Sequence, residues 1–143
     1  MKVYLSSDHA GFDLKEELKK FILENGCQVF DLGCDSSEKS CSYAVQGKML
    51  ANKILKDEKS IGVAICGTGL GMSYSVNRFK GIRGARVTSS EDAIMARKHN
   101  DANIIIFGSR QISKKEAIKL FTDFAYTEFE GGRHISRIEE LDK

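Results

Sequence analysis

The 143-residue sequence has no proline, no apolar run long enough to cross a membrane as a helix, and almost no excess of one charge. Lysine and arginine number 22 against 20 aspartates and glutamates, which leaves a formal net charge of +2. So small a surplus excludes nucleic acid and anionic membranes as general partners, and any function based on positive charge must be local. The missing apolar run excludes a membrane-spanning helix. No functional conclusion follows from the absence of proline.

Metal-binding and leader patterns are missing as well. No two cysteines have C-x-x-C spacing and no two histidines have H-x-x-x-H spacing, so we expect no zinc site, no redox pair and no other cofactor. The first residues lead directly into a strand pattern rather than a signal peptide, which predicts a cytoplasmic protein. In that compartment the four cysteines should be free thiols; they are Cys27, Cys34, Cys41 and Cys66.

What is present is a regular alternation of strand and helix patterns. Apolar runs predict strands at Lys2–Ser6, Cys27–Leu32, Ile61–Cys66, Arg83–Val87 and Ala102–Phe107. Helical patterns cover Phe12–Glu24, Tyr43–Leu55, Met72–Arg78, a segment capped at Ser89-Ser90 that ends near His99, a segment capped at Ser113 that runs through Ala125, and His134–Leu141. We therefore predict one α/β domain over residues 1–143, a three-layer α/β/α sandwich around a five-stranded, mainly parallel, Rossmann-like sheet.

Ligands in such folds bind beyond the carboxyl ends of the strands, and the strongest local motif lies at one of these ends. It follows the third strand and reads Cys66-Gly67-Thr68-Gly69-Leu70-Gly71. Its alternate glycines let backbone amides turn toward one point, so the turn can hold a phosphate, a carboxylate or an enediolate oxygen and favour a thiolate at Cys66. A dinucleotide-binding turn would instead follow the first strand with G-x-G-x-x-G spacing.

Two histidines with polar neighbours lie next to ends of predicted strands. Asp8-His9-Ala10-Gly11 follows the first strand, and Lys98-His99-Asn100-Asp101 precedes the fifth. Each has a structural interpretation too, because Asp8 can cap a helix and His99 can be a favourable charge at a helix C-terminus.

Arginines provide candidate anion ligands. Arg133 and Arg137 are four residues apart, so on a helix they project from one face and can grip one phosphate, whereas in the structural interpretation they are simply solvated. Arg110, after the fifth strand, is a further candidate.

Five ordered motifs resemble those of the type B ribose-5-phosphate isomerases, a family that includes galactose-6-phosphate isomerase subunits. The resemblance runs from residue 2 to about residue 140. It rests on Asp8-His9-Ala10-Gly11, Cys66-Gly67-Thr68-Gly69-Leu70-Gly71, His99-Asn100-Asp101, Phe107-Gly108-Ser109-Arg110 and Gly131-Gly132-Arg133-His134.

The resemblance implies interconversion of ribose 5-phosphate and ribulose 5-phosphate through a cis-enediolate, without a metal. It implies that Cys66 is the base and His99 the acid that opens the sugar ring, and that Thr68 lies beside the developing oxyanion. It also implies a homodimer or dimer of dimers with the active site between subunits. The implied substrate contacts are Asp8, His9, Gly67, Gly69, Leu70, Gly71, Asn100, Arg110, Arg133 and Arg137.

One segment departs from the family pattern. The family usually has Asp-Tyr-Pro after the position of Glu38, whereas here the chain reads Lys39-Ser40-Cys41-Ser42-Tyr43 and is two residues shorter, with Tyr43 aligned to a later aromatic position. The pocket wall and the exact sugar therefore stay open. The alternatives are a hexose-6-phosphate isomerase of the galactose or allose type, and a non-catalytic module that binds sugar phosphates.

Overall fold

The structure, a computed structural model, describes residues 1–143 and contains every predicted element. The strands are β1 (Lys2–Ser7), β2 (Gln28–Asp31), β3 (Ile61–Cys66), β4 (Gly84–Arg86) and β5 (Ile104–Gly108). The helices are α1 (Phe12–Glu24), α2 (Tyr43–Lys56), α3 (Leu70–Val76), α4 (Ser90–Lys98), α5 (Lys114–Ala125) and α6 (His134–Leu141). The sheet is parallel throughout in the order β2-β1-β3-β5-β4, which confirms the predicted α/β fold. None of the helices is long and apolar enough to cross a membrane.

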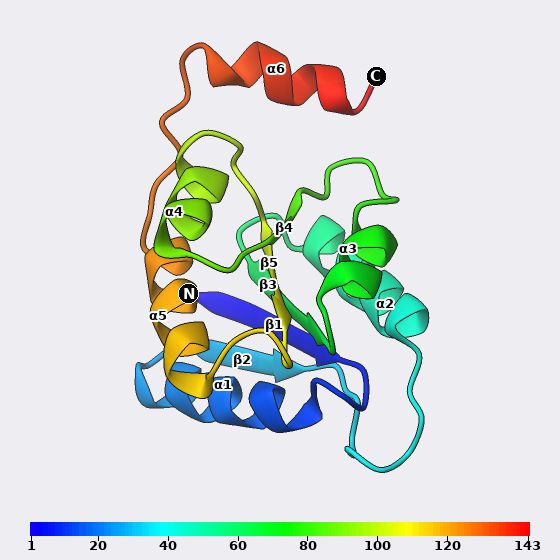
Figure 1. The fold of residues 1–143 in the computed structure, drawn as a ribbon. Coiled ribbons are helices and arrows are strands. Elements are labelled where there is room, and N and C mark those ends of the chain that lie inside the picture. Colours follow the sequence, from blue (N-terminus) through cyan, green and yellow to red (C-terminus); the bar gives the residue numbers. More distant parts are fainter.

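Helices cover both faces of the sheet, with α1, α4 and α5 on one face and α2 and α3 on the other (Figure 1). On β3, Val63 and Ile65 pack with α1, α4 and α5, whereas Ala64 and Cys66 pack with α2 and α3. Because helices cover both faces of the sheet, the inner strands are apolar along their whole length. The alternation places the Cys66 side chain on the α2–α3 face.

Helix α6 belongs to neither layer. In Figure 1 it lies across the top of the molecule, and its first residue, His134, stacks on His99 at the end of α4. His134 is its only buried residue, whereas Ile135 and Leu141 are 48% and 68% exposed. Asp142, just after the helix, accepts the N–H of Gly81 at 3.0 Å.

The bounds of α1, β3 and α6 are as predicted, and the other observed ends differ from the predicted ones by at most two residues, most clearly at α3. This helix begins two residues early because Gly69 adopts a left-handed conformation (φ +79°) and the Thr68 hydroxyl accepts the N–H of Leu70 at 3.2 Å. It ends at Val76, and the side-chain amide of the next residue, Asn77, donates to the carbonyls of Ser73 and Gly84 at 3.1 and 3.0 Å. The glycine turn thus passes directly into a helix.

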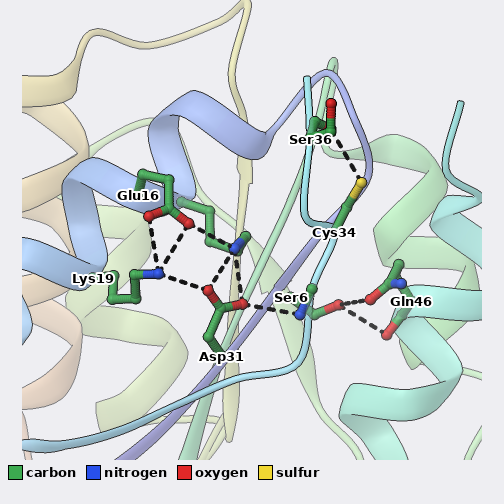
Figure 2. Close-up of polar contacts among 9 residues, drawn as sticks. Ser6, Glu16, Lys19, Asp31, Cys34, Ser36 and Gln46 are labelled. Carbon is green, nitrogen blue, oxygen red and sulfur yellow. Dashed lines mark hydrogen bonds and ion pairs between the residues drawn. The ribbon is translucent and has the colours of Figure 1, made fainter. Parts of the chain in front are cut away.

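A buried lysine fixes the carboxyl end of β2. Lys15 of α1 is 1% exposed, and its Nζ donates to both carboxylate oxygens of Asp31 at 2.7 and 2.8 Å. Lys19 and Glu16 complete the charged network (Figure 2). Asp31 also accepts the N–H of Gly33 at 2.9 Å, so the segment that leads to α2 starts from a fixed point.

Candidate functional site

The candidate residues form two groups. Strands β1, β3 and β5 are parallel and in register, so their carboxyl ends meet at one edge of the sheet. The strand order reverses direction at β1 and β3, the place where ligands bind in open α/β sheets. We call the candidate residues that follow these strand ends the cysteine cluster: Asp8, His9, Cys66, Gly67, Thr68, Gly69, Leu70, Gly71 and Arg110.

The glycine turn presents free backbone donors. The N–H groups of Gly67, Thr68 and Gly69 donate to no backbone carbonyl. The carbonyls of the same turn are occupied, because Gly67 accepts the N–H of Arg110 at 3.0 Å and Thr68 accepts Nε of Arg86 at 2.8 Å. Tied carbonyls and free N–H groups make the turn suited to an anion.

Two larger side chains border this turn. A β-carbon on Gly67 would lie 2.6 Å from Nη1 of Arg110, so the guanidinium rests directly on the backbone of the turn. A β-carbon on Gly71 would likewise lie 2.6 Å from the Tyr43 ring. Cys66 itself is only 4% exposed. The structure therefore places Tyr43 beside the turn, a contact that the sequence did not predict.

Asp8 and His9 complete the cysteine cluster. Asp8 is 8% exposed, and its Oδ1 accepts the N–H of Gly11 at 3.0 Å, so it also shapes the turn before α1. Nδ1 of His9 accepts the N–H of Cys41 at 3.2 Å. The same Nδ1 lies 3.4 Å from the carbonyl of Cys41, so this one residue of the loop holds the His9 ring through Nδ1.

The second group, the histidine cluster, lies where α4 and α6 meet: His99, Asn100, Glu130, Arg133, His134 and Arg137. Because α4 ends just before β5 begins, this cluster lies at the amino edge of the sheet. Cys66 pairs with Gly108 at the other end of β5. The five residues of β5 alone separate the two edges by about 16 Å.

The imidazoles of His99 and His134 stack, with centroids 4.4 Å apart and planes at 18°. Nε2 of His99 lies 3.6 Å from Oε2 of Glu130, and Oε1 of the same carboxylate binds Arg133 at 3.0 Å. Burial, together with Arg133 and His99, lowers the pKa of His134. Its buried Nε2 has no hydrogen-bond partner, with Glu130 4.0 Å away.

Two arginines hold the turn that carries His99 and Asn100. Asp101 adopts φ 47°, unusual for a residue other than glycine. Its carboxylate binds Arg97 at 2.9 Å and Arg83 at 3.2 Å, and Nε of Arg83 donates to the carbonyls of Asn100 and Asp101 at 3.0 Å. The end of α4 is thus pinned by charge rather than by deep burial.

Comparison with known proteins decides the family. The model of the Ribose/Galactose Isomerase family matches residues 3–141. This chain belongs to that family. Ribose-5-phosphate isomerase B of Escherichia coli (strain K12) is 36% identical over 140 residues, which cover 98% of this chain and 93% of that protein.

Solved structures agree with this assignment. A ribose 5-phosphate isomerase from Thermotoga maritima superposes with a TM-score of 0.96 at 41% identity, covering 99% of this chain and 97% of the other. Ribose-5-phosphate isomerase B from Mycoplasma genitalium, with bound ribulose-5-phosphate, gives 0.94 at 34% identity, covering 98% and 93%. The chain is an aldose–ketose isomerase of this family.

In this isomerase the predicted site residues are not all neighbours. Arg110 lies with Cys66, whereas Arg133 and Arg137 lie with His99. Both His9 and His99 were predicted as site residues because they lie near the ends of predicted strands. The structure places His9 at the carboxyl edge of the sheet and His99 at the amino edge. Glu130 and His134 had no predicted role, although His134 was part of the last motif; nothing in the sequence around Glu130 indicated its contact with His99.

His99, Glu130 and His134 also offer three potential metal-ligand atoms within 4.8 Å of one another. Zinc requires ligand atoms aimed at one centre about 2.0–2.2 Å away. The two imidazoles are nearly parallel, so their in-plane lone pairs do not converge on one centre. As placed, these side chains do not form a zinc cage, and a metal-free reaction stays our prediction.

Proposed function

We propose that this isomerase interconverts ribose 5-phosphate and ribulose 5-phosphate without a metal. The observation that carries the proposal is the glycine turn, where a buried thiol adjoins three free N–H groups and the Arg110 guanidinium. Abstraction of a proton next to a carbonyl requires a base and a prepared site for the negative charge that develops on oxygen. The turn offers both within a few residues.

In this mechanism the Cys66 thiolate removes the proton from C2 of the open-chain aldose. Electrons move onto the C1 oxygen and give a cis-enediolate, whose charge is held by backbone N–H groups of the turn and by the Thr68 hydroxyl. The proton of the C2 hydroxyl passes to the C1 oxygen, and the Cys66 thiol returns its proton to C1 while C2 becomes the carbonyl of the ketose. No atom is gained or lost.

The remaining groups act before and around this step. His99 protonates the ring oxygen as the furanose opens. Asp8, His9 and Asn100 contact the sugar hydroxyls. The phosphate is held by Arg110, Arg133 and Arg137, because guanidinium groups bind phosphate with two parallel hydrogen bonds.

The reaction further requires a second copy of the chain, since Cys66 and His99 lie at opposite edges of one sheet. We infer a homodimer, alone or paired into a tetramer, in which the histidine cluster of one subunit completes the cysteine cluster of the other. Exposed apolar residues of α2 and α3 beside the glycine turn support this inference: Tyr43, Val45, Met49, Leu70 and Tyr74 are 42–61% exposed. So does α6, which stands outside the layers (Figure 1).

A galactose- or allose-type hexose 6-phosphate is the second candidate substrate, favoured by the shortened segment Lys39–Tyr43 at the pocket wall. The deciding experiment measures ketose formation from ribose 5-phosphate, galactose 6-phosphate and allose 6-phosphate, with and without a chelator. We expect the highest kcat/KM with ribose 5-phosphate and no effect of chelation. A higher kcat/KM with a hexose phosphate, or loss of activity on chelation, would refute the assignment.

A further inference from the structure

Cys34 and Cys41, which do not have the C-x-x-C spacing of a redox pair, lie near each other in the folded protein. Cys34 and Cys41 line one cavity of about 250 Å³ between the Cys34–Ser42 segment and Gln46 of α2. Both are free thiols; Cys34 is 6% exposed and Cys41 is half-buried. The missing C-x-x-C spacing argued against a redox pair, but the folded segment returns on itself and brings the two thiols together.

The backbone holds this pair from both ends. The N–H of Cys34 donates to the carbonyl of Ser7 at 3.0 Å, which continues the pairing between β1 and the β2 end. Its thiol points to the carbonyl of Ser36 at 3.2 Å (Figure 2). The N–H of Cys41 donates to His9 at 3.2 Å, and Ser42 caps α2. Two residues held by hydrogen bonds therefore line one cavity, and the N–H of Glu38 donates to the hydroxyl of Ser36 at 3.0 Å in the segment between them.

The two thiols also interact electrostatically. Burial is the largest cause that raises the pKa of Cys41 to about 11, and the hydrogen bond with the neighbouring Cys34 thiol comes second. This interaction requires the two thiols to lie near each other, as a disulfide also does.

We propose that Cys34 and Cys41 are a covalent modification site that forms a reversible disulfide with a peroxide as oxidant. The thiolate of one of the two cysteines attacks one peroxide oxygen, the O–O bond breaks, and a sulfenic acid and water form, with the proton of that thiol taken up by the departing oxygen. The other cysteine then loses its proton and attacks the sulfenic sulfur, which forms the S–S bond and releases a second water. Two thiols are oxidised by two electrons and one peroxide is reduced to two waters. A dithiol reverses the bond by exchange.

The expected effect of the disulfide on isomerase activity rests on the proposed function, whereas the formation of the disulfide does not. Cys41 supplies the N–H that holds His9, a proposed sugar contact. A bond to Cys34 draws Cys41 along the cavity and alters this hydrogen bond. Loss of one such bond corresponds to about a 2- to 12-fold change, and we expect a rise in KM for ribose 5-phosphate of this size.

The test treats the reduced protein with hydrogen peroxide, blocks the remaining thiols with an alkylating agent and maps peptides by mass spectrometry. The variants are Cys34→Ser, which removes the bond, and Cys27→Ser as a matched control. KM and kcat for ribose 5-phosphate are measured before oxidation, after it and after dithiothreitol. The Cys34→Ser variant separates this effect from direct oxidation of Cys66, which would inhibit both proteins alike.

We expect a Cys34–Cys41 linked peptide in the parent protein and in Cys27→Ser, with a KM rise that dithiothreitol reverses and that Cys34→Ser lacks. Cys34 and Cys41 recovered as separately alkylated residues, or linked instead to Cys66 or to a second chain, would overturn the proposal. A protein without isomerase activity on any substrate would refute the proposed function, yet the peptide map would still decide whether the disulfide forms.

Discussion

The cysteine cluster and the histidine cluster are built in different ways. The first follows buried parallel strands, and backbone hydrogen bonds fix its turns between two core layers. The second stands on the end of α4 and on α6, where side-chain ion pairs and one ring stack provide the contacts. A single chain therefore prepares the proposed base and anion hole rigidly, whereas the proposed acid and phosphate ligands lie on a part that we expect a second subunit to complete.

The largest expected effect comes from Cys66→Ser. A serine hydroxyl ionises far too weakly at neutral pH to act as the base, and general-base catalysis contributes about 100- to 10,000-fold. We expect kcat for ribose 5-phosphate to fall by that range while phosphate still binds. Cys27→Ser, at a half-buried cysteine just before β2 and so at the amino edge of the sheet, away from Cys66, is the control. Near-parental turnover of pure Cys66→Ser would remove Cys66 from the mechanism.

His99→Asn tests the other cluster. His99 is proposed to act in ring opening alone, so the variant should lose about 100-fold or more on the cyclic substrate. A sugar phosphate that cannot cyclise should bypass the defect and react at nearly the parental rate. Kinetics with both substrates measure the difference. Equal losses on the two would show that His99 acts elsewhere in the reaction.

Arg133→Ala and Arg137→Ala should each weaken phosphosugar binding by about 1.5–3 kcal/mol, or about 12- to 160-fold, the range for hydrogen bonds to charged groups. Arg133→Lys should recover only part of this loss, because lysine lacks the planar pair of donors. Inhibition constants for inorganic phosphate measure the effect, with Lys115→Ala, an exposed cation of α5, as the control. Unchanged constants in both alanine variants would move the phosphate site to Arg110 and His9.

The smallest expected effect is a pH dependence confined to the histidine cluster. Burial, with Arg133 and His99, lowers the pKa of His134 below its ordinary 6.5, so the unfolded chain binds a proton more readily than the folded one. The stabilisation is therefore full above pH 6.5 and is lost as the pH falls toward the lowered pKa. Thermal melts at pH 7.5 and 5.5 should show a smaller drop in Tm for His134→Gln than for the parent. An equal drop would contradict the lowered pKa.

Much of the fold was predictable from local pattern. Continuous apolar runs such as Ile61–Cys66 and capped helices such as the one after Ser113 depend on neighbouring residues, and all eleven elements were found. The conformation of the glycine turn also depends on neighbouring residues, and its proposed function in holding an anion follows from that backbone conformation. Local pattern could not reveal contacts between distant segments, namely Tyr43 on Gly71 and Glu130 beside His99.

The sequence motifs also did not predict that the two clusters lie at opposite edges of the sheet. The order of elements already places a residue between a helix end and a strand start, as His99 is, at the amino edge of a parallel sheet. The motifs match in sequence order and carry no information about which edge each residue occupies. The proximity of Cys34 and Cys41 was not predicted for a related reason. Residues seven positions apart come together only when the segment between them folds back.

The most direct test of the shared site combines two inactive proteins. Cys66→Ser and His99→Asn subunits are unfolded together and refolded, or co-expressed with different tags, and the mixed dimer is assayed with ribose 5-phosphate. In a two-fold dimer with shared sites, one site of each mixed dimer joins an intact Cys66 to an intact His99, so a random mixture should recover about one quarter of parental activity. A mixture that stays as inactive as its parents would show that each chain builds its site alone, which contradicts the account.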